Sequence, residues 1–471
     1  MLSFHVPGHQ GGRGADPELH RLLGTPTLWA DLTEVLGIDD LHRPTGQIKE
    51  AQELAAETFG AEETHFLING STSGNQAMLL ATTGPGDLVL MPRNAHRSLW
   101  SGLMLSGASA AVYDPPFDHE LGVYAVATAE TVQQAKARHP QAKAFVLSSP
   151  SYHGHAADTK AVVEAAHEHT MLLLADEAWG AHLGFHEGYP TSAVHAGADL
   201  TVQSTHKMLP SLTQTAMLHV NGERVDRHRL DQVLRTLLSS SPSAPLLASL
   251  DSARRQYALH GQAILEELAY LSEMTQHELN RLEGILCRGG KLDRPGAVSL
   301  RDPARLVISA LGRGRSGYEL EAYLRYEQRI QIEMADAFGV VVVLTAGHKE
   351  EHLRTLIHAV ESLPQGAPGA ESLAPTAPPP FPSGILTPAH ALRASSLAVP
   401  WEQAEGRLSA ETVTLYPPGI PWLLPGEPIG LASLKELHAR RKVGGKIQGA
   451  ADLTLATVRV LVDDSLERTQ R

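Results

Sequence analysis

The chain has 471 residues, a formal net charge of −13 at pH 7 and 42% hydrophobic residues. This size predicts two or three domains with a sizeable core, and the acidic balance argues against nucleic-acid binding. The sequence lacks the roughly 18 uninterrupted apolar residues of a membrane span, and its start lacks a basic segment followed by an apolar run. The single cysteine, Cys287, cannot form an internal disulfide. We therefore expect a cytoplasmic protein with no nucleic-acid or membrane partner.

The sequence divides into five segments. We expect an irregular N-terminal arm at residues 1–45, a large domain at 46–245, a small α+β domain at 246–363, a Pro-rich linker at 364–384 and a C-terminal domain at 385–471. A long amphipathic helix is predicted over 250–285. Strands of the small domain are predicted at 304–311 and 338–345.

In the large domain, short apolar runs alternate with helical patterns. The apolar runs occupy residues 65–68, 88–91, 144–147, 171–175 and 200–203, and a typical helical pattern occupies 158–169. This alternation predicts an α/β fold with a mostly parallel sheet covered on both faces. Such sheets bind ligands outside the carboxyl ends of their strands.

The first segment with functional character follows the run at 65–68. The residues Gly70-Ser71-Thr72-Ser73-Gly74-Asn75 open a helical pattern. Backbone N–H groups and hydroxyls at a helix start suit a phosphate group. The alternative is an ordinary helix cap.

Three further residues follow strand ends in chain order. His96, after 88–91, has a flat ring that suits stacking on an aromatic cofactor, or it is a solvated loop residue. Asp176 ends the apolar run LLLAD, where it pairs with a protonated pyridine nitrogen or serves as a cap or salt-bridge partner. Lys207, in STHK after 200–203, is either a surface lysine or the lysine that carries a cofactor as a Schiff base.

Taken together, the four features form the set that pyridoxal 5′-phosphate (PLP) requires. An imine to a lysine holds the cofactor aldehyde and is exchanged for the substrate amine. A carboxylate keeps the ring nitrogen protonated, so that the ring accepts electrons from the breaking bond. A phosphate cradle and a stacking ring complete the set, and the sequence therefore predicts a PLP enzyme.

At these residues the sequence resembles the fold-type I basic amino acid decarboxylases, the ornithine/lysine/arginine decarboxylase family. The resemblance is strongest to the shorter, Bacillus-type biosynthetic arginine decarboxylases. It runs from end to end, through FHVPGHQGG (4–12), NGSTSGN (69–75), PRNAHRS (92–98), SPSYHG (149–154), DEAWGAH (176–182), STHKMLPSLTQ (204–214), YPPGIPWLLPGE (416–427) and KIQGAADLTLATVRV (446–460). The family has a large PLP-binding domain, a small domain and a C-terminal decarboxylase domain.

The resemblance implies a role for each matching residue. Lys207 forms the Schiff base, Asp176 pairs with the pyridine nitrogen, and His96 stacks on the ring, with Ala178 on the opposite face. The phosphate contacts are Ser71, Thr72, Ser73, Gly74, Ser204 and His206, and Ser240 reaches the phosphate of a neighbouring subunit in a homodimer or larger homo-oligomer. Lys207, His206 or a group from the other subunit protonates Cα after CO₂ has left.

The expected reaction is decarboxylation of a basic amino acid in polyamine metabolism. The family likeness favours arginine to agmatine, then lysine to cadaverine, then ornithine to putrescine. Trp179 departs from the DEAH sequence common in short arginine decarboxylases, and this puts the substrate preference in doubt. The predicted acceptors for the distal cation of the substrate are Asp31, Glu34, Asp39, Asp40 and Glu427.

Two other functions remain open. A PLP aminotransferase or aldolase-type enzyme shares the fold and the imine chemistry. A non-catalytic PLP-binding regulator is the second alternative. We expect no metal site, because the histidine pairs 153/155 and 167/169 lack the three-ligand spacing of a zinc site.

Overall fold

The structure, a computed structural model, describes residues 4–290, 299–366, 386–416, 420–442 and 444–462. At its centre is a seven-stranded sheet with the strand order β1-β10-β9-β8-β6-β2-β3. These strands are β1 (Glu63–Leu67), β2 (Leu88–Pro92), β3 (Ser109–Tyr113), β6 (Ala144–Ser148), β8 (Leu172–Asp176), β9 (Leu200–Gln203) and β10 (Ala216–Val220). The five strands from β9 to β3 pair in parallel, whereas β10 is antiparallel to both of its neighbours. The predicted mostly parallel sheet is confirmed.

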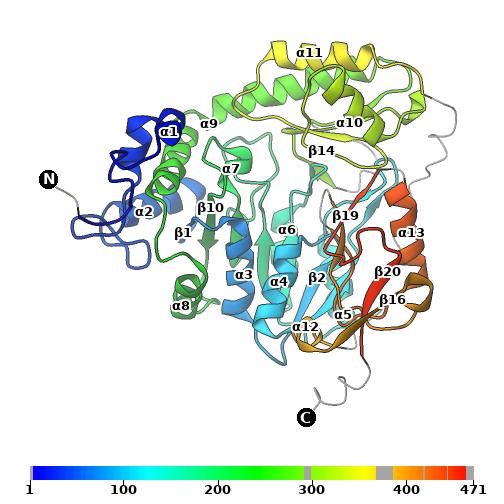
Figure 1. Cartoon of the computed structure of the whole chain (residues 1–471), viewed down its shortest axis with the longest axis horizontal. Coiled ribbons are helices and arrows are strands. Elements are labelled where there is room, and N and C mark those ends of the chain that lie inside the picture. The colour runs from blue at the N-terminus through cyan, green and yellow to red at the C-terminus, as the bar shows by residue number, and fades with distance from the viewer. Residues whose placement is uncertain (1–3, 291–298, 367–385, 417–419, 443, 463–471) are drawn as a thin grey trace.

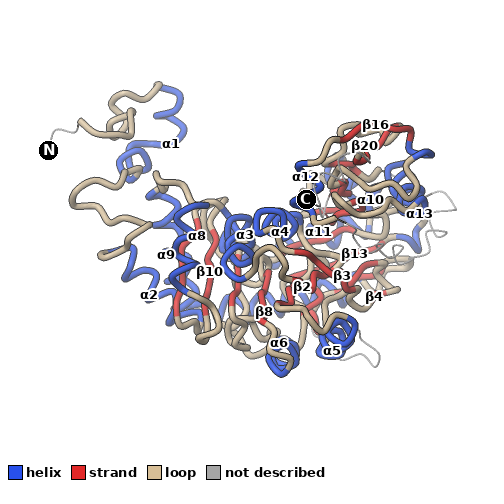
Figure 2. Tube along the Cα trace, turned by 90° about the horizontal axis from the view of Figure 1, so that it is seen from below, coloured by secondary structure: helices blue, strands red, loops and turns tan. Residues whose placement is uncertain are grey.

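Helices cover both faces of this sheet, which explains its almost continuous apolar strands. In Figure 2, α3 (Gly70–Thr82) and α4 (Arg97–Ser106) lie on one side, with α5 (Ala129–Arg138) and α6 (Thr159–Glu168) on the other. Helix α8 (Arg227–Leu237) packs on α3, and α2 (Gln47–Phe59) packs beside β1. At Gly74, α3 lies so close to the sheet that a Cβ atom would be 2.7 Å from Leu67 Cδ1.

The long helix α9 (Ala244–Leu279) leads from the large domain into the small one (Figure 1). It begins and ends six residues earlier than the predicted span of 250–285, because Pro245 favours a helix start at the first turn and Asn280 ends the helix. The small domain has an antiparallel sheet, β11-β13-β15-β14, built from β11 (Leu286–Arg288), β13 (Arg305–Ser309), β14 (Met334–Ala335) and β15 (Val340–Val343). Helices α10 (Gly317–Tyr326) and α11 (Glu350–Glu361) accompany it.

Small strand pairs join or extend these units. β12 (Leu300–Arg301), which precedes the small-domain strand β13, pairs with β7 (His155–Ala156) of the large domain. The hairpin of β4 (Phe117–Asp118) and β5 (Val123–Tyr124) follows β3. The large and small domains share one hydrophobic core that includes Leu265 of α9.

The C-terminal unit has its own core, with Val413, Leu434 and Val458 buried. Its elements are α12 (Pro388–Arg393), β16 (Ser396–Pro400), β17 (Val413–Tyr416), β18 (Ile420–Leu423), α13 (Leu431–Lys442), β19 (Lys446–Gln448) and β20 (Thr457–Leu461). Most of the predicted linker, from residue 367 onward, lies outside the described residues. None of the helices in the described ranges is both long and apolar enough to cross a membrane.

The expectation of an irregular arm at residues 1–45 is wrong in one respect, because α1 (Pro17–Ala30) is helical. The Asp16 side chain accepts a hydrogen bond from the Glu18 N–H, and Pro17 occupies the first helical position, both of which are helix-start signals. Gly24, with φ of 72°, kinks the helix and breaks its apolar periodicity. Because of this break, the apolar residues of the helix do not follow a regular helical spacing in the sequence.

Candidate active site

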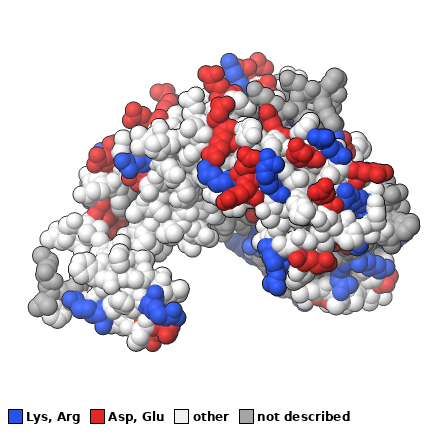
Figure 3. Space-filling view, turned by 90° about the horizontal axis from the view of Figure 1, so that it is seen from above, with Lys and Arg blue, Asp and Glu red and all other residues white. Residues whose placement is uncertain are grey.

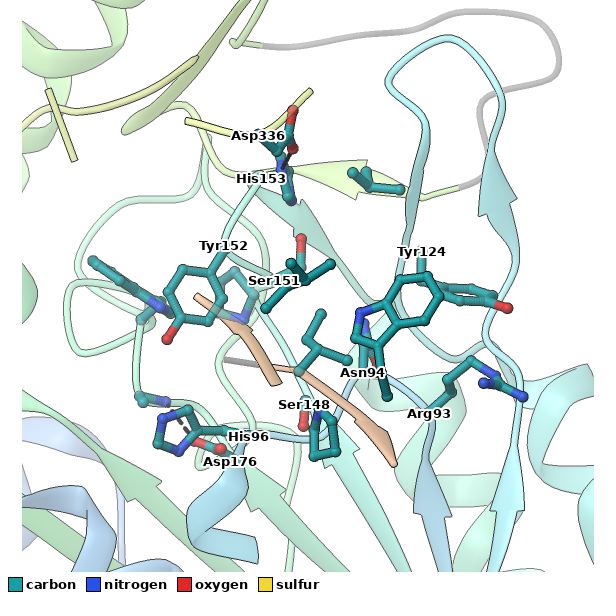
Figure 4. Close-up of a pocket in the computed structure, with 18 of the residues that line it drawn as sticks. Arg93, Asn94, His96, Tyr124, Ser148, Ser151, Tyr152, His153, Asp176 and Asp336 are labelled. Atoms are coloured by element: carbon teal, nitrogen blue, oxygen red, sulfur yellow. Dashed lines mark hydrogen bonds and ion pairs between the residues drawn. The ribbon is translucent and has the colours of Figure 1, made fainter. Parts of the chain in front are cut away.

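A pocket lies where the large, small and C-terminal units meet. Its walls include Ser148 and Asp176, which end β6 and β8, together with Tyr318 of the small domain and Trp422 of the C-terminal unit. Figure 4 shows Asp176 and His96 at the strand ends, with Tyr152 above them and the His153–Asp336 pair on the far side. The pocket therefore occupies the edge of the sheet at which parallel α/β sheets bind their ligands.

Lys207 and Asp176 line this pocket together. Lys207 lies in α7 (Thr205–Met208), directly after β9, and Asp176 is the last residue of the neighbouring strand β8. Asp176 is 7% exposed, and its Oδ1 accepts a hydrogen bond of 3.2 Å from the Ala178 N–H. Burial lowers the pKa of Lys207 to about 8, although the negative charge of Asp176 opposes this shift. The site thus holds an amine that loses its proton readily beside a carboxylate.

His96 is the N-cap residue of α4 and also lines the pocket. Its Nδ1 accepts a hydrogen bond of 3.3 Å from the Ser98 N–H and lies 2.8 Å from the Ser98 hydroxyl. Because Nδ1 is an acceptor, a neutral ring carries its proton on Nε2. Burial lowers the pKa of His96, and Lys207 lowers it further, whereas Asp176 raises it. His96 therefore presents a neutral flat ring to the pocket.

Two hydroxyls meet at the start of α3. Ser204 Oγ donates a hydrogen bond of 2.7 Å to Ser71 Oγ, and Ser71 lines the pocket. Gly70, with φ of +75°, precedes Ser71 and directs the chain into the helix. The free N–H groups of the first helical turn and these two hydroxyls form a site suited to a phosphate.

The other predicted phosphate residues lie differently. Ser73 is buried and donates 2.8 Å to the Gly70 carbonyl, Thr72 is exposed, and Gly74 is packed against the sheet. His206 is half-buried, and its Nδ1 donates 2.7 Å to the Thr215 carbonyl. None of these four is among the pocket-lining residues of the described chain, whereas Ala178 is.

Ser240 lies in the exposed turn between α8 and α9. The neighbouring Ser239 N–H donates 3.2 Å to Asn69 Oδ1, so this turn lies beside the start of α3. In the described chain, Ser240 does not line the pocket. Its predicted contact with the phosphate of a neighbouring subunit stays a prediction.

The predicted substrate acceptors lie outside the pocket. Glu427 lines a separate cavity between the C-terminal unit and α4, where Trp100 also contributes. Burial raises the pKa of Glu427 to about 8, although the charge of Arg93 lowers it. The four acidic candidates of the arm stabilise turns or pair locally: Asp31 with His9, Glu34 with the Leu41 N–H, Asp39 with the Thr45 N–H and Asp40 with the His42 N–H.

Trp179, the residue that departs from the short arginine decarboxylases, forms a wall of the pocket. The Lys207 Nζ lies 4.3 Å from the centroid of its ring, and the Tyr152 ring packs edge-on at 5.3 Å. Tyr152 belongs to the SPSYHG motif, so this motif could have identified it as a residue of the site. No local signal identified Glu333 of the small domain, whose negative charge raises the pKa of Lys207.

Three of the four histidines considered as metal ligands have acidic partners. His153 Nε2 lies 2.8 Å from Asp336 Oδ2, His155 Nε2 lies 2.8 Å from Asp118 Oδ2, and His167 Nε2 lies 2.9 Å from Asp199 Oδ2. Elsewhere in the described chain, Glu63, His65 and Asp231 bring possible ligand atoms within 4.8 Å of one another. Arg227 already pairs with Glu63 there, so the group has a positive charge without a metal ion.

Comparison with known proteins bears on this arrangement. Residues 1–289 match the family described as "Orn/Lys/Arg decarboxylase, major domain", and residues 380–449 match "Orn/Lys/Arg decarboxylase, C-terminal domain". The chain is 37% identical to the arginine decarboxylase of Bacillus subtilis over 463 residues, which cover 98% of this chain and 94% of that protein. The arginine decarboxylase of Bacillus anthracis is 36% identical over 465 residues, with the same coverage.

Solved structures show the same fold. The Francisella novicida lysine decarboxylase LdcF superposes with a TM-score of 0.82 at 18% identity, covering 98% of this chain and 79% of that one. The fold is thus that of the fold-type I enzymes, with a decarboxylase domain at the C-terminus. The sequence motifs, the three-unit fold and nearly full-length similarity together show that this chain belongs to the Orn/Lys/Arg decarboxylase family.

Proposed function

We propose that this chain is a PLP-dependent decarboxylase that converts arginine to agmatine in polyamine metabolism. The observation that carries the proposal is the meeting of Lys207 and Asp176 in one pocket beneath the C-terminal unit. Relatives named arginine decarboxylases match almost the whole chain. Because Cys287 is buried and has no second cysteine to pair with, we also propose a cytoplasmic location.

The side chains in and around the pocket fit PLP. A buried amine, a strand-end carboxylate, a flat neutral ring and hydroxyls at a helix start are the groups that this cofactor needs. Lys207, Asp176, His96 and Ser71 line one cavity, and the buried Ser204 hydroxyl is hydrogen-bonded to Ser71 behind them. When bound, PLP supplies an electron-accepting ring for the bond that releases CO₂. Lys207 would hold the cofactor, Asp176 would keep the pyridine nitrogen protonated, and Ser71 with Ser204 would bind the phosphate.

The residues of the chain also prepare the proton movements. Burial keeps a large fraction of the Lys207 amine neutral near its pKa of about 8, so the amine can take up and return protons. His96 contributes a neutral ring rather than a charge. Trp179 and Tyr152 close one side of the pocket with apolar surface, which excludes water from the reacting groups.

Glu333 is the proposed acceptor for the distal cation of the substrate. Its side chain is exposed and does not line the pocket, yet its charge acts on the pocket residues Lys207 and Tyr152, so it lies near them. By contrast, the pocket-lining Asp336 already accepts hydrogen bonds from His153, Phe338 and Gly339. The backbone N–H of Glu333 donates 3.1 Å to the Val341 carbonyl, but its carboxylate makes no hydrogen bond or ion pair with other described residues and is available to a guanidinium or ammonium group.

We propose that two copies of the chain assemble as a homodimer. The N-terminal arm exposes large apolar side chains, with Phe4 96% and Trp29 69% exposed. Figure 3 shows the arm standing away from the body, with mostly uncharged surface around the notch between them. Exposed apolar surface of this kind marks a protein–protein contact, and a second copy would cover it. In such a dimer, the exposed turn at Ser240 remains the proposed contact to the phosphate of the neighbouring subunit.

A second substrate is lysine. The lysine decarboxylase LdcA of Pseudomonas aeruginosa is 32% identical over 279 residues, covering 53% of this chain and 37% of that protein. Trp179 is the residue that favours this alternative, since short arginine decarboxylases commonly have histidine there. An aminotransferase would use the same lysine without releasing CO₂.

One experiment tests the proposal and separates the alternatives. The purified enzyme, supplied with PLP, is incubated separately with arginine, lysine and ornithine, and CO₂ and the amine product are measured. We expect agmatine from arginine as the main product. Lys207→Ala should lose several orders of magnitude in rate and the borohydride-reducible chromophore. Transamination without CO₂, or normal activity of Lys207→Ala, would overturn the proposal.

A further inference from the structure

Arg305 places a fully buried guanidinium behind the wall of the pocket. It is the first residue of β13 and is 0% exposed. Its Nη1 donates a hydrogen bond of 3.0 Å to Met208 Sδ, and its Nη2 donates 3.3 Å to the Trp179 carbonyl. Among the described residues, its Nε has no hydrogen-bond partner. A buried cation with so few acceptors is costly, so its position calls for a reason other than stability.

The same guanidinium shares an aromatic ring with Lys207. Arg305 Cζ lies 4.3 Å from the centroid of the Trp179 ring, and Lys207 Nζ lies 4.3 Å from the same centroid. Met208, which accepts the hydrogen bond from Arg305, directly follows Lys207 in the chain. Arg305 therefore contacts both the ring against which the amine lies and the residue next to that lysine.

Backbone contacts between the two domains surround Arg305. Strand β12 pairs with β7, and the Asp302 N–H donates 2.8 Å to the Gly154 carbonyl. At Gly154, with φ of +84°, a Cβ atom would lie 2.6 Å from Arg305 Cβ. Any other residue at 154 would displace Arg305, so this glycine of the SPSYHG motif makes room for the arginine. Burial lowers the pKa of Arg305, and the charges of Asp302 and Glu333 oppose that shift.

We propose that Arg305 is a positioning residue for the cofactor lysine, because its guanidinium packs on the Trp179 ring and places a positive charge on the same ring against which the Lys207 amine lies. The inference rests on the proposed function of Lys207. A like charge nearby disfavours protonation of an amine, and Arg305 acts on Lys207 in that direction. Arginine suits the task because it stays charged at any working pH and stacks on aromatic rings.

Several other groups act on or are coupled to the Lys207 amine. Asp176 and Glu333 raise the pKa of Lys207, and the amine in turn lowers the pKa values of His96 and His206. Burial lowers the pKa values of both histidines, which favours their neutral forms. Among these groups, Arg305 supplies the permanent positive charge that offsets the two carboxylates.

The test measures the titration of Lys207 directly. The full-length chain, freed of cofactor, is labelled with an amine reagent at a series of pH values, and mass spectrometry follows the peptide that contains Lys207. Arg305→Gln keeps a polar N–H donor on a shorter side chain but removes the charge. Arg305→Lys keeps the charge. Arg288→Gln is the matched control, because Arg288 is a buried arginine on the adjacent strand β11 and pairs with Glu120.

We expect a midpoint near 8 for the parent chain and a rise of about one pH unit in Arg305→Gln. Arg305→Lys should stay closer to the parent than Arg305→Gln, and Arg288→Gln should not move the midpoint. A merely structural role would instead disturb both Arg305 variants alike.

The proposal is overturned if the parent titrates near the ordinary lysine value of about 10.4. It is also overturned if Arg305→Gln leaves the midpoint unchanged or if Arg288→Gln shifts it equally. If Arg305→Gln does not fold, the labelling midpoints of Lys207 in the parent chain and in Arg305→Lys still test the proposal. The labelling requires no turnover, so its outcome is separate from whether the enzyme decarboxylates arginine.

Discussion

Ser204 Oγ donates a hydrogen bond of 2.7 Å to Ser71 Oγ, and this bond links the start of α3 to the residue that precedes α7. The phosphate site and the cofactor lysine are thereby joined through one pair of hydroxyls. The bond spans 133 positions of the chain. It holds the phosphate-binding start of α3 close to the segment that carries the cofactor lysine.

Removing either hydroxyl should weaken PLP retention. A hydrogen bond to a charged group contributes about 1.5–3 kcal/mol, so Ser71→Ala and Ser204→Ala should each raise the Kd for PLP by about tenfold or more. Equilibrium dialysis followed by absorbance measures the bound cofactor. Ser101→Ala, on α4 and outside the pocket, is the control and should bind PLP like the parent. Unchanged PLP affinity in both site variants would contradict the phosphate assignment.

Asp176→Asn should reduce the decarboxylation rate by about two orders of magnitude or more, because an amide cannot hold the pyridine nitrogen protonated. Steady-state kinetics and the absorption spectrum of the bound cofactor provide two readouts. Asp199→Asn removes another buried carboxylate, one paired with His167, and should lower stability without changing the cofactor spectrum. A fully active Asp176→Asn would remove Asp176 from the site.

Glu333→Gln should raise the KM for arginine by about tenfold or more while changing kcat less, because the carboxylate binds the distal cation away from the reacting bond. Initial rates over a range of arginine concentrations measure both constants. Glu327→Gln, an exposed glutamate at the end of α10, is the control and should behave like the parent. If Glu333→Gln keeps the parent KM for every basic amino acid, the acceptor lies elsewhere.

Glu427 should make stability depend on pH. Burial raises its pKa to about 8, above the unfolded value of about 4.3, so the folded chain holds this proton more tightly. The stability that it contributes is complete below about pH 4 and is lost as pH rises through 8.

Glu427→Gln should therefore melt about 3 °C or more above the parent at alkaline pH and close to the parent near pH 5. Thermal unfolding at both pH values tests this, with the exposed Glu405→Gln as the control. A higher melting temperature only at acid pH would contradict the assigned direction.

By itself, the sequence determined the family, the mostly parallel sheet, and the residues that follow each strand. These features are local, because an apolar run, a turn and a helix start each depend on residues that are neighbours in the sequence. Lys207, Asp176, His96 and Ser71 were identified in this way, and the parallel strands bring all four to one pocket.

Only the tertiary structure decided which residues from other units complete the pocket. The hydrogen bonds of Arg305 to Met208 and to the Trp179 carbonyl span 97 and 126 positions, and no local pattern predicts such contacts. Glu427 carried the family motif yet lies in a separate cavity, whereas Glu333 had no motif and lies close enough to act on Lys207. The physical reason is that side-chain partners across domains depend on how the large, small and C-terminal units pack together, and spacing along the chain does not encode that packing.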